Sequence, residues 1–316
     1  MLSDLARRGA VCVTLAAVAL AMLPGCGSTA RQQALIAYEA QVGDATNVYT
    51  VDPRSGASTQ VTHGTSFDGN PAWSPDRKRI LFSSRRDGQS KNDLYTMDVG
   101  GGNVSRLTDT ADASEWSAKF SRDGAQITFV REAADGWSVW LMRADGSGQR
   151  RVAGPYPFAE FPAWAPNGRE VYFAAIMPAP AGAPAAMSHI YSVDPTTGNV
   201  RTRIDTGGTD ACPHFSRDGK RLTYAASRAG GEYDSGNNLD LFAHDLSSDD
   251  TTGAHDAALT DDPARDDYGN ASPDDTQMVF VSDRDGNAEL YLMGRDGSNQ
   301  RRLTNTPDAR ENVPDW

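Results

Sequence analysis

Acidic side chains recur in this 316-residue chain at matching places of a repeated pattern. The five that share one place are Asp68, Glu115, Asp210, Asp266 and Glu311. Carboxylates that converge around an axis raise one another's pKa values or recruit a cation or a basic partner. We therefore predict an acidic ring around one mouth of a central channel. A weakly held cation at this ring is the one ligand considered, and no other metal or cofactor is expected.

A local explanation of the same carboxylates stays open. Each acid would pair with an arginine at a strand end, and the arginines suitably placed are Arg85, Arg131, Arg228 and Arg284. The repeat without the acid carries Ala159 in its place and Ile176 where an arginine would fall. This joint absence favours local ion pairs over one shared site.

Catalytic motifs are missing from the sequence. It has no Gly-x-Ser-x-Gly elbow, no His-Glu-x-x-His, no Cys-x-x-Cys and no phosphate-binding glycine loop. Of the five dispersed histidines, His214 falls on a strand that could face a channel, but no second histidine supports a metal site there. The stretch from Asp283 to Glu289 lacks the ligand spacing of a calcium loop. A protein without enzymatic activity is the expectation.

Cys26 has a separate chemistry. The apolar run over residues 10–23 is too short to span a membrane and is typical of a signal peptide. It leads directly to Cys26, as in bacterial lipoproteins, whose cysteine thiol receives diacylglycerol. We interpret residues 1–25 as a signal peptide and residues 26–33 as the lipidated cysteine with a short tether. The protein is then expected to be exported and held by its lipid in the cell envelope. Its expected place is the outer membrane, on the side that faces the periplasm.

Composition limits the class of partner. Charged residues make up 23% and hydrophobic residues 39% of the chain, as in ordinary globular proteins. The net charge of −12 repels phosphate backbones, so nucleic-acid binding is not expected.

The elements that position these residues are short strands of a repeated unit. Each unit opens with a Pro-x-aromatic-Ser turn, passes through two β-rich stretches and closes with Leu-Thr, most clearly over residues 71–108. The opening anchors stand at positions 73, 120, 164, 215, 271 and 316, which are 44 to 56 residues apart. A period in the forties with four short strands in each unit is the signature of a β-propeller.

The two ends of residues 34–316 decide the number of blades. The pattern begins in mid-unit at Leu35, and the missing opening strand appears at residues 313–316. We therefore predict an all-β, six-bladed propeller of four-stranded blades. The C-terminal strand completes the first blade and closes the ring, with Trp316 as a core residue. A monomer is expected.

The repeat resembles the WD-like propeller repeats of the TolB family. Residues 73–76 (Trp-Ser-Pro-Asp) and 282–287 (Ser-Asp-Arg-Asp-Gly-Asn) carry the likeness, which covers about residues 34–316. The resemblance implies a protein-binding scaffold with an envelope partner, such as a peptidoglycan-associated lipoprotein. TolB has a separate α/β domain before its propeller, whereas here a short stretch precedes the first strand. Some lyases of pectin fragments use related propellers, so an enzyme acting on acidic oligosaccharides is the alternative.

Two insertions interrupt the otherwise short units, at residues 177–187 and 227–238. Long loops on a rigid scaffold often carry binding functions. Drift in a solvated loop explains them equally well.

Overall fold

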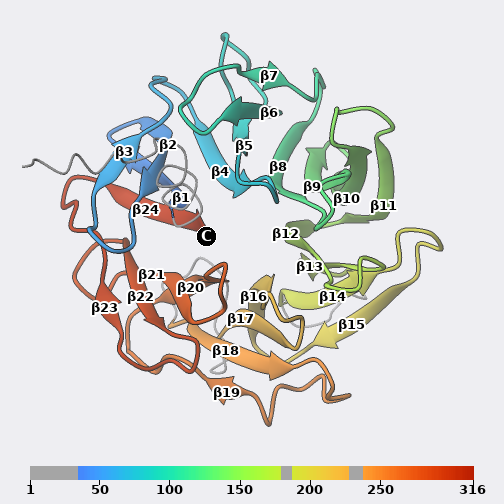
Figure 1. Cartoon of the computed structure of the whole chain (residues 1–316). Helices are drawn as coiled ribbons and strands as arrows, with labels where there is room; N and C mark the ends of the chain where they lie inside the picture. The colour runs from blue at the N-terminus through green and yellow to red at the C-terminus, as the bar shows by residue number, and fades with distance from the viewer. Residues whose placement is uncertain (1–34, 179–186, 228–237) are drawn as a thin grey trace, which may run out of the picture.

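The computed structural model describes residues 35–178, 187–227 and 238–316. Strands rich in β-branched and aromatic residues form six antiparallel sheets of four strands each. The sheets stand as blades around a central axis (Figure 1). The six-bladed propeller predicted from the repeat is confirmed.

Each blade runs from an innermost strand at the axis to an outermost strand at the rim. In that order, the first blade consists of β24 (Arg310–Asp315), β1 (Ile36–Val42), β2 (Ala45–Val51) and β3 (Ser58–Gln60). The second consists of β4 (Asp68–Trp73), β5 (Arg79–Ser84), β6 (Asp93–Asp98) and β7 (Ser105–Arg106). The third consists of β8 (Ser114–Phe120), β9 (Gln126–Ala133), β10 (Gly136–Arg143) and β11 (Arg150–Tyr156).

The remaining three blades follow the same order. The fourth consists of β12 (Phe158–Trp164), β13 (Val171–Ile176), β14 (His189–Val193) and β15 (Val200–Ile204). The fifth consists of β16 (Thr209–Phe215), β17 (Arg221–Ser227), β18 (Asp240–Asp245) and β19 (Ala257–Ala258). The sixth consists of β20 (Asp266–Ala271), β21 (Gln277–Ser282), β22 (Glu289–Gly294) and β23 (Arg301–Arg302).

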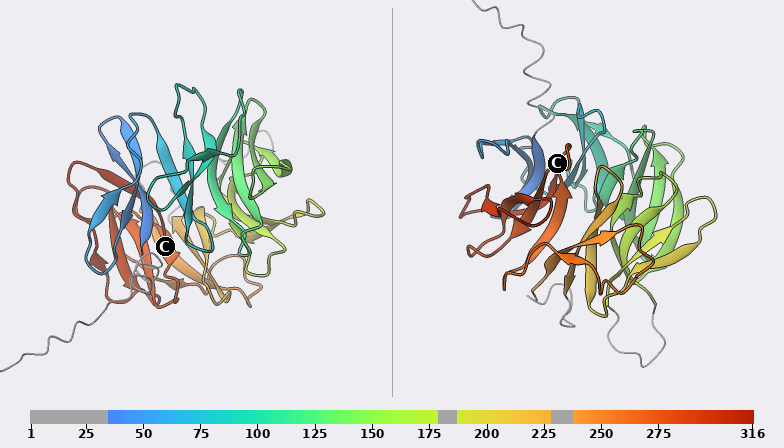
Figure 2. Two further views of the ribbon diagram at one scale, coloured as in Figure 1. Left: turned by 45° about the horizontal axis from the view of Figure 1, so that its top comes forward. Right: turned by 60° about the horizontal axis from the view of Figure 1, so that its bottom comes forward.

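The ring closes where β24 pairs with β1 in an antiparallel ladder that joins Ala37 to Asp315 and Gln41 to Arg310. Trp316 is 5% exposed and packs in a cluster with Ile36 of the first blade and Leu290 of the sixth. Tilted views place this end of the chain beside the central axis (Figure 2). The split first blade is therefore confirmed.

Every inner strand contains one residue in the left-handed backbone region. The six residues, with φ between 47° and 54°, are Asn70, Ser117, Phe161, Cys212, Tyr268 and Val313. The pairing of each inner strand with its neighbour shifts register at or near this residue, as at a β-bulge. Val313 is β-branched, and such residues rarely adopt positive φ. The repeat therefore imposes the bulge whatever side chain occupies it.

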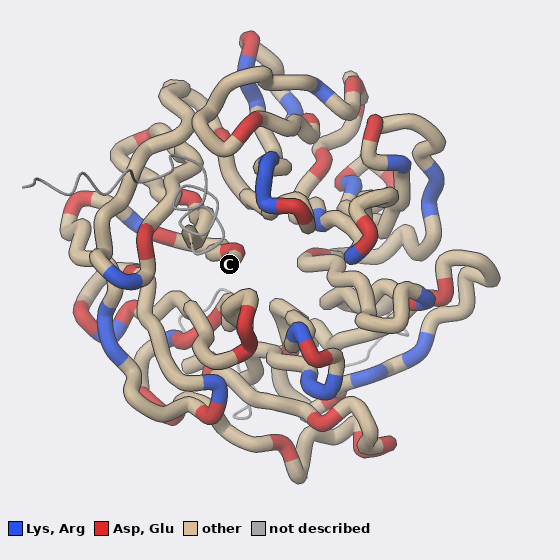
Figure 3. Tube along the Cα trace, viewed as in Figure 1, with Lys and Arg blue, Asp and Glu red and all other residues tan. Residues whose placement is uncertain are grey.

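Charge is spread around the ring, with lysine and arginine interspersed among aspartate and glutamate (Figure 3). Among the described residues, no helix is long and apolar enough to cross a membrane. Cys26 lies outside the described residues, as do positions 179–186 and 228–237 of the two insertions.

Candidate functional site

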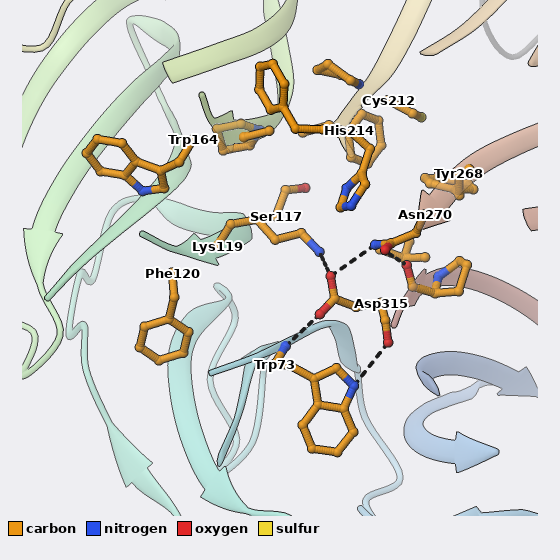
Figure 4. Close-up of a pocket in the computed structure, with 18 of the residues that line it drawn as sticks. Trp73, Ser117, Lys119, Phe120, Trp164, Cys212, His214, Tyr268, Asn270 and Asp315 are labelled. Atoms are coloured by element: carbon orange, nitrogen blue, oxygen red, sulfur yellow. Dashed lines mark hydrogen bonds and ion pairs between the residues drawn. The ribbon is translucent and has the colours of Figure 1, made fainter. Parts of the chain in front are cut away.

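A cavity of about 220 Å³ occupies the centre of the propeller. Its walls are the later halves of the inner strands and the turns that follow them. The aromatic anchors of four repeats, Trp73, Phe120, Trp164 and Phe215, all line it. Trp73, Phe120 and Trp164 are labelled in the close-up (Figure 4). The residues that define the repeat in the sequence thus also contribute to the wall of a concave site, together with prolines of the same repeats.

A single carboxylate, that of Asp315, ties four blades together inside this cavity. Its Oδ1 lies 2.5 Å from Nζ of Lys119 and accepts a hydrogen bond from Nδ2 of Asn270 at 3.2 Å. Its Oδ2 accepts one from the backbone N–H of Trp73 at 2.7 Å (Figure 4). Burial alone would raise the pKa of Asp315, but the charge of Lys119 holds that pKa at about 2. The carboxylate of Asp315 is therefore ionised at physiological pH.

His214 projects into the same cavity (Figure 4). Burial, together with the positive charge of Lys119, lowers the pKa of His214 to about 3. The imidazole is therefore neutral at physiological pH. Among the residues that line the cavity, His214 is the one histidine. The group of three possible metal ligands found among the described residues lies elsewhere, at His189.

The rim of the cavity carries two exposed arginines, Arg122 and Arg217, on the turns after β8 and β16. The acids on these turns already have partners, because Asp123 accepts a hydrogen bond from Ser121 at 2.6 Å and Asp218 accepts one from Ser216 at 2.7 Å. Asp218 also pairs with Arg295 at 3.1 Å. The rim thus offers positive charge on a protein whose net charge is −12.

None of the five carboxylates predicted to form a ring lines this cavity. They lie near the beginnings of the inner strands, at the opposite end from the cavity mouth, and all are between 0% and 3% exposed. Glu115 bonds Thr108, Asp210 bonds His189 and Glu311 bonds Thr304 of the preceding blade. Asp68 instead bonds Ser84 and Arg86 of its own blade. The repeat aligns each acid with two positions of the preceding blade, one near the start of its third strand and one in or just after its fourth. We call this set of three positions a junction node.

The junction nodes follow the blades around the ring. From the first blade to the second the node is Asn47, Thr62 and Asp68, and from the second to the third it is Asp93, Thr108 and Glu115. From the third to the fourth it is Ser138, Ala153 and Ala159, and from the fourth to the fifth His189, Asp205 and Asp210. From the fifth to the sixth it is Asp240, Thr260 and Asp266, and from the sixth to the first Glu289, Thr304 and Glu311.

The threonine organises the node wherever it occurs. The Oγ1 of Thr108 lies 3.2 Å from Oδ1 of Asp93 and 3.0 Å from Oε2 of Glu115, and it accepts the N–H of Leu94 at 2.8 Å. Burial raises the pKa of Glu115 to about 7, although the charge of Arg131 opposes the shift. Two buried carboxylates thus share one hydroxyl between neighbouring blades.

Arginine pairing accounts for several of these acids. Glu115 binds Nε of Arg131 at 2.8 Å, and Asp266 binds Nη2 of Arg284 at 2.7 Å. Asp68 binds Arg86 at 3.1 Å.

Two of the arginines named from the sequence do not fill that role. Arg85 lies over the ring of Phe67, with its Cζ 5.7 Å from the ring centroid. Arg228 lies outside the described residues. Glu311 accepts hydrogen bonds from the hydroxyls of Thr304 and Thr306, where the prediction expected an arginine. The five carboxylates are therefore distributed among separate blade junctions and do not form a ring open to the channel, because their side chains are buried where neighbouring blades meet.

The node between the fourth and fifth blades has a different composition. Nδ1 of His189 lies 3.0 Å from Oδ2 of Asp210 and 3.5 Å from Oδ1 of Asp205. The hydrogen bond to Asp210 raises the pKa of His189, and the charge of Asp205 adds to the shift. His189 and Asp205 were not predicted, although aligning the third strands of the repeats would single out the histidine.

Two comparisons of sequence relate the chain to known proteins. Residues 31–182 match the family of TolB β-propeller domains. An uncharacterised protein of Agrobacterium fabrum is 31% identical over 143 residues, which cover 42% of this chain and 48% of that protein. The Tol-Pal system protein TolB of Anaeromyxobacter dehalogenans is 31% identical over 101 residues, which cover 30% of this chain and 21% of TolB. The chain therefore spans less than half the length of either relative.

Solved structures share the architecture. TolB from Acinetobacter baumannii matches with a TM-score of 0.72 and 20% identity, over 90% of this chain and 67% of that chain. An oligogalacturonate lyase in complex with manganese matches with a TM-score of 0.56 and 15% identity, over 88% of this chain and 75% of the lyase. At these identities the likeness shows the fold alone.

Proposed function

Because this chain belongs to the TolB-like β-propeller family, we propose that it is a protein-binding scaffold of the bacterial cell envelope rather than an enzyme. The partner is an envelope protein, and one resembling a peptidoglycan-associated lipoprotein is the candidate that the TolB likeness favours. The partner binds at the mouth of the central cavity.

The observation that carries this proposal is the composition of the cavity. Tryptophan and arginine dominate the energetic centres of protein interfaces, and concave, mostly apolar sites bury the side chains that anchor a partner. Here Trp73 and Trp164 form walls, and Arg122 and Arg217 stand at the rim. The ion pair of Lys119 with Asp315 fixes the inner strands that present them. Such a site suits an apolar side chain on an acidic segment of a partner.

We further propose that the propeller is tethered to the membrane. The support is the sequence before the first strand, in which an apolar run ends at Cys26. A lipid on Cys26 holds the propeller at the outer membrane on its periplasmic side. The tether leaves the monomeric propeller free to meet a partner in the envelope.

The test is a pull-down of the full chain from its own membranes, with two charge-reversal variants compared. Arg122→Glu changes the cavity rim, whereas Arg54→Glu is the matched control, because Arg54 is exposed on the turn after β2 and does not line the cavity. Wild type and Arg54→Glu should capture the same envelope protein, and Arg122→Glu should bind it at least tenfold more weakly.

Two results would contradict the scaffold. One is equal capture by both variants, which would move the partner away from the cavity. The other is cleavage of an acidic oligosaccharide by the purified protein, which would favour a lyase.

A further inference from the structure

The junction node between the fourth and fifth blades departs from the repeat at two of its three positions. His189 stands where the other nodes carry Asn47, Asp93, Ser138, Asp240 and Glu289. Asp205 stands where four of the others carry Thr62, Thr108, Thr260 and Thr304. Asp210 keeps the acid of the inner strand. A contact bridged by a hydroxyl is thus replaced by an imidazole and two carboxylates.

The spacing of these three groups suits a metal ion. Zinc binds histidine nitrogen and carboxylate oxygen at about 2.0–2.2 Å, so two ligands of a tetrahedral ion lie about 3.3–3.6 Å apart. Nδ1 of His189 lies 3.5 Å from Oδ1 of Asp205 and 3.0 Å from Oδ2 of Asp210. All three ligand atoms lie within 4.8 Å of one another. Small side-chain movements would place them around one ion.

The other histidine–aspartate pairs of the chain provide an internal comparison. Nδ1 of His244 lies 2.9 Å from Asp256, and Nδ1 of His255 lies 3.1 Å from Asp250. Among the described residues, a second carboxylate completes a group of three ligands at His189 alone. An acidic composition alone therefore does not explain the cluster, because the two other histidine–aspartate pairs have no second carboxylate that completes a group of three ligands.

The three side chains differ in how far they are buried. Asp210 is fully buried, and Thr206 holds both of its oxygens, through its N–H at 3.1 Å and its hydroxyl at 2.7 Å. The side chain of His189 is 18% exposed and that of Asp205 is 49% exposed. One ligand is thus fixed by its surroundings, while the side of Asp205 is open for an ion to enter.

We propose that His189, Asp205 and Asp210 form a zinc site that links the fourth blade to the fifth. An imidazole with two carboxylates suits Zn²⁺ better than Ca²⁺ or Mg²⁺, which prefer oxygen ligands throughout. The site joins the start of β14, the segment after β15 and the start of β16. It lies at the opposite end of the inner strands from the central cavity and does not depend on the proposed partner.

The experiment titrates the full chain with zinc chloride by calorimetry and measures thermal unfolding with and without zinc. Two variants install residues that other junction nodes already carry, Asp205→Thr and His189→Asn, so both are compatible with the fold. Wild type should bind one Zn²⁺ per chain and melt at a higher temperature in zinc. Each variant should bind zinc at least tenfold more weakly and lose the zinc-dependent rise.

The matched control is His255→Asn, which removes a histidine that is paired with one aspartate and should bind zinc as wild type does. The thiols are identical in all four proteins, so differences among them report on the node. Equal zinc binding by Asp205→Thr and wild type would overturn the proposal. So would an absence of binding by wild type at millimolar zinc.

Discussion

Lys119 and Asp315 meet inside the central cavity, with Nζ 2.5 Å from Oδ1, although 196 residues separate them in the sequence. Removing the lysine leaves a carboxylate whose side chain is 12% exposed without its counter-charge. Breaking a fully buried pair costs about 3–5 kcal/mol. Since the Lys119 side chain is 26% exposed, we expect Lys119→Met to lower the free energy of unfolding by about 2–3 kcal/mol.

Denaturant unfolding measures this loss. Adding Asp315→Asn to Lys119→Met should recover part of it, because the unpaired charge is then gone. A single variant as stable as wild type would show that the pair does not fix the inner strands.

The stability of the junction nodes should depend on pH through Glu311. Burial raises the pKa of Glu311 to about 7 from an ordinary value of 4.5, against the hydrogen bonds of Thr304 and Thr306 and with a contribution from Glu289. The folded protein then binds more protons than the unfolded chain between these values. Stability from this group is therefore present at low pH and is lost as the pH rises toward 7.

Glu311→Gln removes this titration while keeping the shape of the side chain. The free energy of unfolding of Glu311→Gln minus that of wild type should increase by roughly 1–3 kcal/mol as the pH rises from about 5 to about 8. Comparing the two proteins cancels the titration of other groups, such as His214. A difference that stays constant over this range would contradict the shared-carboxylate description.

Ring closure depends on the strand that completes the first blade. Trp316 is 5% exposed and packs against residues of the first and sixth blades, and tryptophan-to-alanine changes in cores cost about 3–5 kcal/mol. We expect Trp316→Ala to lose an amount in this range and deletion of residues 312–316 to lose more. Thermal unfolding measures both. An unchanged melting temperature after the deletion would be incompatible with closure by β24.

Membrane attachment is tested at Cys26. Cys26→Ser removes the thiol that would carry diacylglycerol, so incorporation of a labelled fatty acid should be lost and the protein should leave the membrane fraction. Cys212→Ser is the control, because that thiol is buried in the propeller. Labelling that persists in Cys26→Ser would exclude lipidation at this residue.

The blades were predictable because each repeat carries its own strand and turn signals. Trp73 and Trp164, for example, mark inner strands because each is an aromatic residue at the same place in its repeat. The spacing of these anchors predicted the number of blades. The split blade followed from the same pattern, since an incomplete unit begins at Leu35 and its missing strand ends at Trp316.

The candidate sites were harder to predict for two physical reasons. The bulge in each inner strand decides which side chains reach the cavity, yet its left-handed positions hold residues as different as Asn70, Phe161 and Val313. No single residue type at this position therefore marks the bulge in the sequence. The partners of Asp315 and Asp210 lie on other blades, so their contacts depend on how neighbouring sheets pack.

The pairing of β1 with β24 also affects how the protein is made. During synthesis β1 emerges before every other strand of the propeller, while its partner β24 appears after all of them. Sheets built from consecutive strands can form early, but β1 keeps an unpaired edge until β24 is available, and such edges promote aggregation. Contacts between segments so distant in sequence form slowly. We therefore expect the yield of native protein to depend on how well this edge is protected until β24 is available.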